Sequence, residues 1–131
     1  MLLLPFFVRV NKLHSYDMEA DRPLRPQLWK TSDLSLVGVL RGHKRGVWAI
    51  EFSPVDKCIA SASGDQTVRL WSVTDFSCIK TLEGHTSSVL CVKFMRLGTQ
   101  LMSGGADGIM KLWNIRESEV RARFAIGEYV L

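Results

Sequence analysis

The feature that most constrains this chain is a tryptophan, preceded by a leucine, that returns at a fixed interval. Trp29, Trp71 and Trp113 are evenly spaced, and we call the interval between neighbouring members one repeat. The same shift relates further residues in pairs: Gly42-His43 with Gly84-His85, Phe52 with Phe94, Ser61 with Ser103, Asp65 with Asp107, and Leu70 with Leu112. Self-similarity at a period of ~20–50 residues is typical of proteins built from structural repeats. The sequence therefore predicts a repeat architecture, in which a recurring residue belongs to the framework.

The repeat divides the chain into five segments. Residues 41–82 and 83–124 are complete units, and residues 27–40 hold the end of an earlier one. We expect residues 1–26 to form an irregular N-terminal extension and residues 125–131 a short C-terminal tail. Stacked repeats need about three or more neighbours to bury their apolar faces. We therefore expect these units to belong to a larger assembly of repeats.

Each complete unit contains four short apolar or β-branched segments separated by turn-forming residues, which is the pattern of consecutive strands. The expected strands are residues 46–52, 57–63, 67–73 and 77–82 in the first unit, and 89–94, 99–104, 109–115 and 119–124 in the second. The incomplete unit supplies strands at 27–30 and 35–40. No segment has a convincing helical period, so an all-β fold is predicted.

Charge, cysteine and hydropathy patterns weigh against several classes of protein. The net charge of +4, from 17 basic and 13 acidic residues, permits contact with nucleic acid without requiring it. Cys58, Cys78 and Cys91 form no CxxC pair, and we expect small, buried, reduced side chains. No residue cluster suits zinc or calcium, so neither a metal nor a cofactor is expected. The apolar residues 1–8 follow no basic region and are too few to span a bilayer, so no membrane partner is expected.

One recurring set of residues resembles catalytic chemistry, because His43, Ser61 and Asp65 are the residue types of a Ser-His-Asp triad. With the tryptophan that shortly follows each aspartate, the set forms two tetrads: His43, Ser61, Asp65 and Trp71, then His85, Ser103, Asp107 and Trp113. An enzyme needs one active site, and neither serine lies in a nucleophile elbow. An indole N–H, a hydroxyl, an imidazole and a carboxylate can instead satisfy one another in a chain of hydrogen bonds. We therefore predict structural tetrads, no catalytic residue and no enzymatic activity.

A glycine-rich segment, residues 104–108, resembles a phosphate-binding loop. It lacks a following Lys-Ser/Thr pair, and no helix is expected after it. It occupies the place of residues 62–66 in the preceding unit, which favours a tight turn. No small-molecule substrate is expected.

One basic group falls outside the repeat. Arg41, Lys44 and Arg45 flank His43, with Trp48 just after them, whereas the next unit has Glu83, Thr86 and Ser87 in place of the three basic residues. Non-repeated residues on a repeat scaffold are candidates for specific contacts. The group is either a set of solvated loop charges or a docking site for RNA phosphate or an acidic protein surface.

These motifs carry a family resemblance. Gly42-His43 and the run from Ser61 to Trp71 resemble the WD40 repeat, whose GH and WD signatures mark the four-stranded blades of a propeller. The resemblance covers residues 27–124 and implies a partial WD40 β-propeller, with two full four-stranded blades and the end of a preceding blade.

The pattern departs from the family at both ends of the chain. Pro23 stands where the aspartate of an earlier tetrad would stand, and Ile126-Gly127 replace the next Gly-His. Trp29 therefore belongs to a blade whose first half is not recognisable in the sequence.

Three stretches are more narrowly similar to the transducin beta-like, U3-associated WD-repeat proteins of the small-subunit processome: residues 40–48, 75–90 and 98–108. This resemblance implies a nucleolar, non-catalytic scaffold in U3-dependent pre-rRNA processing and 18S rRNA maturation. The implied partners are other WD40 proteins of the processome, with U3 snoRNA or pre-rRNA as candidate RNA partners. The alternative is a general WD40 adaptor, such as a ubiquitin-ligase substrate receptor or a signalling scaffold.

Overall fold

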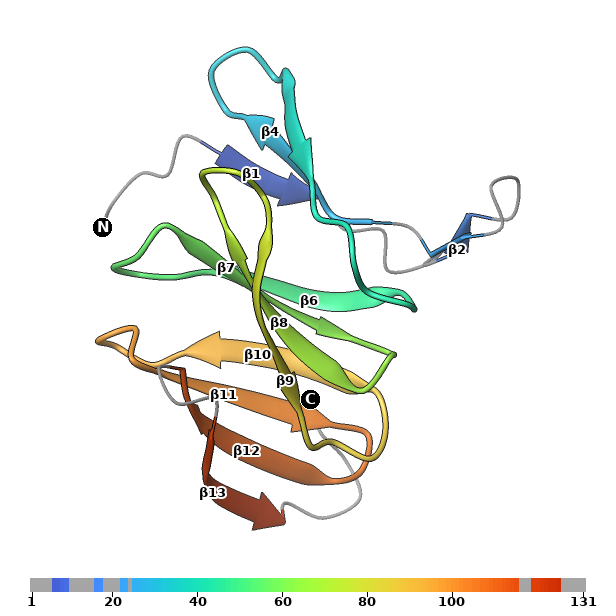
Figure 1. The fold of residues 1–131 in the computed structure, drawn as a ribbon, viewed down its shortest axis with the longest axis vertical. Coiled ribbons are helices and arrows are strands. Elements are labelled where there is room, and N and C mark those ends of the chain that lie inside the picture. The colour runs from blue at the N-terminus through green and yellow to red at the C-terminus, as the bar shows by residue number, and fades with distance from the viewer. Residues whose placement is uncertain (1–5, 10–15, 18–21, 24, 116–118, 126–131) are drawn as a thin grey trace.

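The computed structural model describes residues 6–9, 16–17, 22–23, 25–115 and 119–125, with side chains for residues 25–115. Within these residues every regular element is a β-strand, and the strands form antiparallel sheets (Figure 1). The predicted all-β fold is confirmed. Three of the sheets follow one another through the molecule in chain order, and we call them the first, middle and last sheets.

The middle sheet is built from the first complete repeat. Its strands are β6 (Val47–Phe52), β7 (Cys58–Ser63), β8 (Thr67–Ser72) and β9 (Cys78–Glu83), hydrogen-bonded in that order. Local chemistry closes the hairpins. Ser53 Oγ accepts hydrogen bonds from the backbone N–H groups of Val55 and Asp56, at 3.3 and 3.0 Å, between β6 and β7. Such a serine turn reverses the chain without long-range contacts.

The last sheet repeats this plan. Its strands are β10 (Val89–Phe94), β11 (Gln100–Gly105), β12 (Ile109–Asn114) and β13 (Glu119–Ala125), again paired in chain order. The turn from β11 to β12 has Gly108 at a φ of 76°, and the matching turn from β7 to β8 has Gln66 at 72°. Glycine adopts this left-handed backbone more readily than a residue with a Cβ, so the two turns share a shape that suits Gly108 better.

The first sheet has three strands: β1 (Phe6–Arg9), β4 (Gln27–Lys30) and β5 (Leu36–Val39), in the order β1-β4-β5. A small hairpin of β2 (Tyr16–Asp17) and β3 (Arg22–Pro23) separates β1 from β4 in sequence. The expectation that residues 1–26 are irregular was therefore wrong for these segments. The physical reason is that β4 has a second edge to pair, and the segment Phe6–Arg9 is rich in strand-forming residues.

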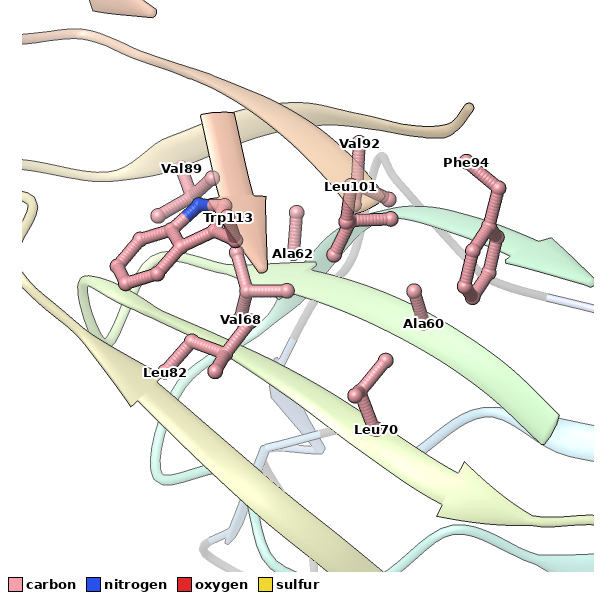
Figure 2. Packing of buried hydrophobic residues seen from close by; sticks show 10 residues of the cluster. All are labelled: Ala60, Ala62, Val68, Leu70, Leu82, Val89, Val92, Phe94, Leu101 and Trp113. Atoms are coloured by element: carbon pink, nitrogen blue, oxygen red, sulfur yellow. The ribbon is translucent and has the colours of Figure 1, made fainter. Parts of the chain in front are cut away.

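Two apolar clusters join the three sheets, and each is a shifted copy of the other. The cluster between the middle and last sheets includes Leu70, Leu82, Phe94, Leu101 and Trp113 (Figure 2). The cluster between the first and middle sheets includes the residues one repeat earlier: Leu28, Leu40, Phe52, Ile59 and Trp71. The repeat in the sequence is thus a repeat of one packing contact.

Each sheet therefore has two distinct faces. The front face packs on the preceding sheet and carries the repeating tryptophan, as the last sheet does with Val92, Phe94, Leu101 and Trp113. The back face packs on the following sheet, as the middle sheet does with Ala60, Ala62, Val68 and Leu70 (Figure 2). Successive side chains on a strand point to opposite faces, so one alternating pattern supplies both contacts.

The cysteines only partly match the expectation of buried thiols. Cys58 and Cys91 are half-buried, and burial raises the pKa of both thiols. Cys78 is exposed, because it lies on β9, the outer strand of the middle sheet. None of the three forms a disulfide. No group of metal-binding side chains occurs within the described residues, and they include no helix long and apolar enough to cross a membrane.

Candidate functional site

The structure brings the first predicted tetrad together at one end of the middle sheet. Trp71 on β8 donates its indole N–H to Ser61 Oγ on β7, at 2.8 Å. Ser61 Oγ lies 2.5 Å from Nε2 of His43, which stands in the loop before β6. His43 Nδ1 lies 2.8 Å from Oδ2 of Asp65 in the turn between β7 and β8. One chain of hydrogen bonds thus ties a loop, a turn and two strands together.

The second tetrad repeats these contacts in the last sheet. Trp113 Nε1 donates to Ser103 Oγ at 2.7 Å, and Ser103 Oγ lies 2.7 Å from His85 Nε2. His85 Nδ1 lies 3.0 Å from Asp107 Oδ2. Two independent copies with the same atoms in the same order indicate a framework element of the repeat.

Each aspartate also holds the backbone around it. Asp65 Oδ2 accepts the backbone N–H of Lys44 at 3.0 Å, and Asp65 Oδ1 accepts both the backbone N–H and the hydroxyl of Thr67, at 3.1 and 2.6 Å. Asp107 accepts the backbone N–H groups of Thr86 and Ile109, both at 3.1 Å. The carboxylates therefore fix the loop that carries each histidine.

These bonds also determine the ionisation of the carboxylates. Burial raises the pKa of Asp65, but hydrogen bonds from His43 and Thr67 outweigh burial and hold that pKa well below its usual range. Burial likewise raises the pKa of Asp107, and hydrogen bonds from His85, Thr86 and Ile109 lower it on balance. Both carboxylates are therefore charged acceptors near neutral pH.

The geometry gives the serines no open side from which to attack a substrate. Ser61 is 0 % exposed and Ser103 is 1 % exposed. With His Nδ1–H donating to the aspartate, Nε2 accepts the serine O–H, and the serine oxygen accepts the indole N–H. In this arrangement the indole N–H, the serine hydroxyl and both imidazole nitrogens of a tetrad all have hydrogen-bond partners inside the protein. Such a network suits a structural link between elements.

A basic side chain covers the tryptophan in each tetrad, and the sequence-based prediction missed this feature. The Arg69 guanidinium carbon lies 5.9 Å from the Trp71 ring centre, and Lys111 Nζ lies 5.8 Å from the Trp113 ring centre. Lys111 Nζ also donates to the backbone oxygen of Gly84. Arg69 and Lys111 are one repeat apart, so the shift that revealed the tetrads could also have found this cation–π pair.

The same side chains explain the glycine of the Gly-His motif. A Cβ on Gly84 would lie 2.7 Å from Lys111 Nζ and 3.3 Å from the Trp113 ring. A Cβ on Gly42 would collide with the Arg69 guanidinium. The motif therefore needs glycine for two reasons: Gly42 and Gly84 have positive φ values of 157° and 152°, which a residue with a Cβ rarely adopts, and the cation and the tryptophan ring lie against the backbone there.

No tetrad surrounds Trp29 within the part of the chain that the structure describes. Its Nε1 is buried without a hydrogen-bond partner among the described residues. In the middle sheet Ser61 pairs with Arg69, and Ile59 pairs with Trp71. By the same register the first sheet sets Phe7 opposite Trp29, so Arg9 takes the register position of the tetrad serine. The inference that Trp29 belongs to an incomplete unit agrees with this register, whereas Ile126-Gly127 lie outside the described residues.

The predicted basic group lies in the loop anchored by the first tetrad. Arg41, Lys44 and Arg45 are all exposed, and Trp48 is half-buried at the start of β6. A Cβ on Gly64 would lie 3.3 Å from Trp48 Nε1 and 3.6 Å from Arg45 Cβ, so both side chains lie close to the β7–β8 turn. Ser88 Oγ, just before β10 of the last sheet, reaches within 3.6 Å of the same point. The group therefore sits at the junction of two sheets, on a loop held by Asp65.

Comparison with known families gives the architecture a name. The WD domain, G-beta repeat, matches residues 34–72 and residues 76–114, which together exceed half of the chain. The chain belongs to the WD40 repeat family. No curated protein matches it significantly. The two matches are displaced from each other by the same interval as the tryptophans.

The WD40 matches are offset from the sheets. The first runs from just before β5, in the first sheet, to the end of β8 in the middle sheet. The second runs from just before β9 to the end of β12 in the last sheet. Each WD40 match therefore contains strands of two neighbouring blades, and most of the tetrad lies in the C-terminal part of each match. WD40 repeats of this kind support a non-catalytic scaffold or adaptor role.

Proposed function

We propose that this WD40 chain acts as an interaction scaffold in the small-subunit processome, in U3-dependent pre-rRNA processing and 18S rRNA maturation. The support for this role is the similarity of residues 40–48, 75–90 and 98–108 to transducin beta-like protein 3, a U3-associated WD-repeat protein. The second stretch weighs most, because Phe76-Ser77-Cys78 and Ser87-Ser88-Val89-Leu90 are not required by the repeat. The proposed location is the nucleolus, and the proposed partners are other WD40 proteins of the processome.

The observation that carries a docking role is the unrepeated basic group on a rigid loop. Arg41, Lys44 and Arg45 are exposed, while the loop backbone is fixed by the bond from Lys44 N to Asp65. A loop whose backbone is already fixed loses less conformational freedom on binding than a flexible loop would, which favours affinity. In the proposal this group receives an acidic protein segment or an RNA phosphate of the assembly.

The experiment is affinity purification of the tagged chain from cells at two salt concentrations, with and without nuclease. We expect recovery of processome WD40 proteins, and a loss of most of that recovery in the Lys44→Glu/Arg45→Glu variant. Lys57→Glu is the matched control, because Lys57 is an exposed lysine in a turn at the β6–β7 connection. Recovery that survives nuclease indicates a protein partner, and recovery that nuclease abolishes indicates RNA. Equal recovery by all variants at moderate salt would exclude the basic group as the docking site.

A general WD40 adaptor role, as a ubiquitin-ligase substrate receptor or a signalling scaffold, is the competing function. Imaging of the tagged chain separates the two proposals. Nucleolar staining favours the processome. Staining spread through the cytoplasm, with ubiquitin-ligase or signalling subunits in the purified material, favours the adaptor.

A further inference from the structure

The basic group stands close to an acidic residue at the same end of the middle sheet. Glu83 ends β9, the outer strand of that sheet, and it is exposed. Asp65 accepts the backbone N–H groups of both Lys44 and Thr67, at 3.0 and 3.1 Å, and Thr67 is the Cα partner of Glu83 in the sheet. Since paired Cα atoms of an antiparallel sheet lie ~5 Å apart, this chain of contacts separates Lys44 from Glu83 by about 10–15 Å.

On the other side of Lys44, the positive charge continues toward the last sheet. Arg45 Cβ and Ser88 Oγ each lie 3.6 Å from the point that a Cβ on Gly64 would occupy, at the junction of the middle and last sheets. The exposed charges therefore run from this junction to the outer strand in the order Arg45, Lys44, Glu83. We call these three residues the mixed-charge strip. The ion pairs of the described residues include none of the three, so their charges are available to a partner.

The mixed-charge strip is poorly suited to an RNA strand. Proteins bind single-stranded RNA with a positive groove that follows successive phosphates and with aromatic rings on which the bases stack. In this strip the carboxylate of Glu83 lies beside the two basic residues, and it repels a phosphate chain. The connection before β10 contains no lysine or arginine between residues 84 and 88. Among residues 25–115 no aromatic side chain is exposed, so the bases of an RNA would find no stacking surface there.

A protein segment of mixed charge matches the strip better. The planar guanidinium of Arg45 can hold a carboxylate through two parallel hydrogen bonds, and Lys44 adds a second positive charge beside it. Glu83 can accept a lysine or arginine of the same segment. An extended chain advances ~3.3 Å per residue, so a separation of about 10–15 Å corresponds to three or four residues. Charges of both signs also fix the direction in which the segment lies.

We propose that the mixed-charge strip binds an extended protein segment that carries an acidic and a basic residue three or four positions apart. The acidic residue pairs with Arg45 and Lys44, and the basic residue pairs with Glu83. This inference rests on the proposed docking function of the basic group, and it specifies a protein as the occupant in place of RNA. The carboxylate of Glu83 then serves specificity, because it rejects segments that are acidic throughout.

The test is Glu83→Lys, because protein and RNA partners respond to this substitution in opposite directions. A mixed-charge segment loses one attraction and gains one repulsion, so the nuclease-resistant recovery of partner proteins with the tagged chain should fall by roughly threefold to tenfold. An RNA partner gains a phosphate contact, so its binding would strengthen. Asp56→Lys is the matched control, since it makes the same charge change at an exposed position in the β6–β7 turn, and it should leave recovery unchanged. Thermal unfolding checks that each variant is folded.

Fluorescence anisotropy of a labelled oligouridylate, mixed with the purified chain, is the parallel measurement for RNA. We expect weak binding that Glu83→Lys strengthens, while the recovery of partner proteins falls. Tight oligouridylate binding, together with partner recovery that nuclease abolishes, would identify RNA as the occupant and overturn the inference. Recovery that Lys44→Glu/Arg45→Glu reduces but Glu83→Lys does not would also overturn it, and would leave the basic group as the docking site. Recovery that Lys44→Glu/Arg45→Glu does not change would overturn both the docking site and the inference.

Discussion

Replacing Ser61 with alanine tests whether the tetrad is a structural lock, because this hydroxyl is the shared atom of the network. Ser61 Oγ accepts the Trp71 indole N–H at 2.8 Å and lies 2.5 Å from His43 Nε2, at a site with 0 % exposure. The substitution leaves two buried polar groups without partners, at ~1–3 kcal/mol each. Removing the hydroxyl's own desolvation offsets part of this cost. We therefore expect a loss of about 2–4 kcal/mol in the free energy of unfolding.

The assay is urea unfolding followed by tryptophan fluorescence and circular dichroism, at one fixed protein concentration because association would change apparent stability. Ser77→Ala is the matched control, since Ser77 is exposed and its hydroxyl donates a hydrogen bond only to the nearby Asp75, at 2.7 Å. Substitutions at exposed positions usually change the free energy of unfolding by less than about 0.5 kcal/mol. Ser103→Ala should cost as much as Ser61→Ala, and the costs should add within about 0.5 kcal/mol because the tetrads share no atom. A Ser61→Ala effect no larger than that of Ser77→Ala would refute the lock, and an esterase activity that disappears with Ser61 would refute its non-catalytic character.

The carboxylates, the motif glycines and the buried cations each give a further measurable outcome. The pKa of both Asp65 and Asp107 is lower in the folded chain than in an ordinary aspartate. Their contribution to the free energy of unfolding is therefore present above about pH 4 and is lost as the pH falls further. Urea midpoints measured from neutral to strongly acidic pH should fall less steeply in the Asp65→Asn/Asp107→Asn variant than in the unaltered chain. Gly84→Ala should lower stability by ~1–3 kcal/mol, because its Cβ would lie 2.7 Å from Lys111 Nζ at a φ of 152°. Gly64→Ala is the control and should cost less than about 1 kcal/mol, because its Cβ would meet nothing closer than 3.3 Å. Equal melting curves for the two variants would contradict this prediction. Lys111→Arg should be tolerated, because Arg69 occupies the equivalent position in the middle sheet. Lys111→Met should cost about 1–3 kcal/mol, because it leaves the Gly84 carbonyl without its charged donor. Thermal unfolding distinguishes the two substitutions.

The fixed period made most of this molecule predictable. A shift of one repeat placed each tetrad member on a named strand or turn, and the contacts of Ser61 and Ser103 agree with that placement. The strand bounds lie close to the predicted ones, for example Cys58–Ser63 against residues 57–63. Period and local chemistry agree in these units, so the expected strands formed.

The N-terminal strand was not predictable, because it lies outside the period. Asp17 is the residue one repeat before Ile59, yet Phe7 occupies the matching register position. An insertion that contains the β2–β3 hairpin separates β1 from β4 by more residues than the repeat would use. β1 pairs with β4 because the second edge of β4 would otherwise be unpaired, and that edge exists only once the sheet has folded.

The cations over the tryptophans were missed for a different reason. Charged residues on strands are usually solvated, yet Lys111 is only 3 % exposed. Its burial depends on the Trp113 ring and the Gly84 carbonyl, which come together only when the loop folds back on β12. A search for recurring charge, in addition to recurring apolar residues, would have found Arg69 and Lys111 together.

The offset between the WD40 matches and the sheets has a consequence for how such a chain can grow. Any window of one repeat length contains the equivalent of four strands, either within one blade or divided between two neighbouring blades. A gene duplication that copies any such window in frame therefore inserts the equivalent of one whole blade. The junction of the duplicated segment does not have to fall in a loop between sheets. A window that starts inside a strand ends at the matching point of the equivalent strand one repeat later. Independent domains can be exchanged only when the recombination break falls between them. Genes that encode such repeats do not have this restriction, so the number of blades can change one at a time.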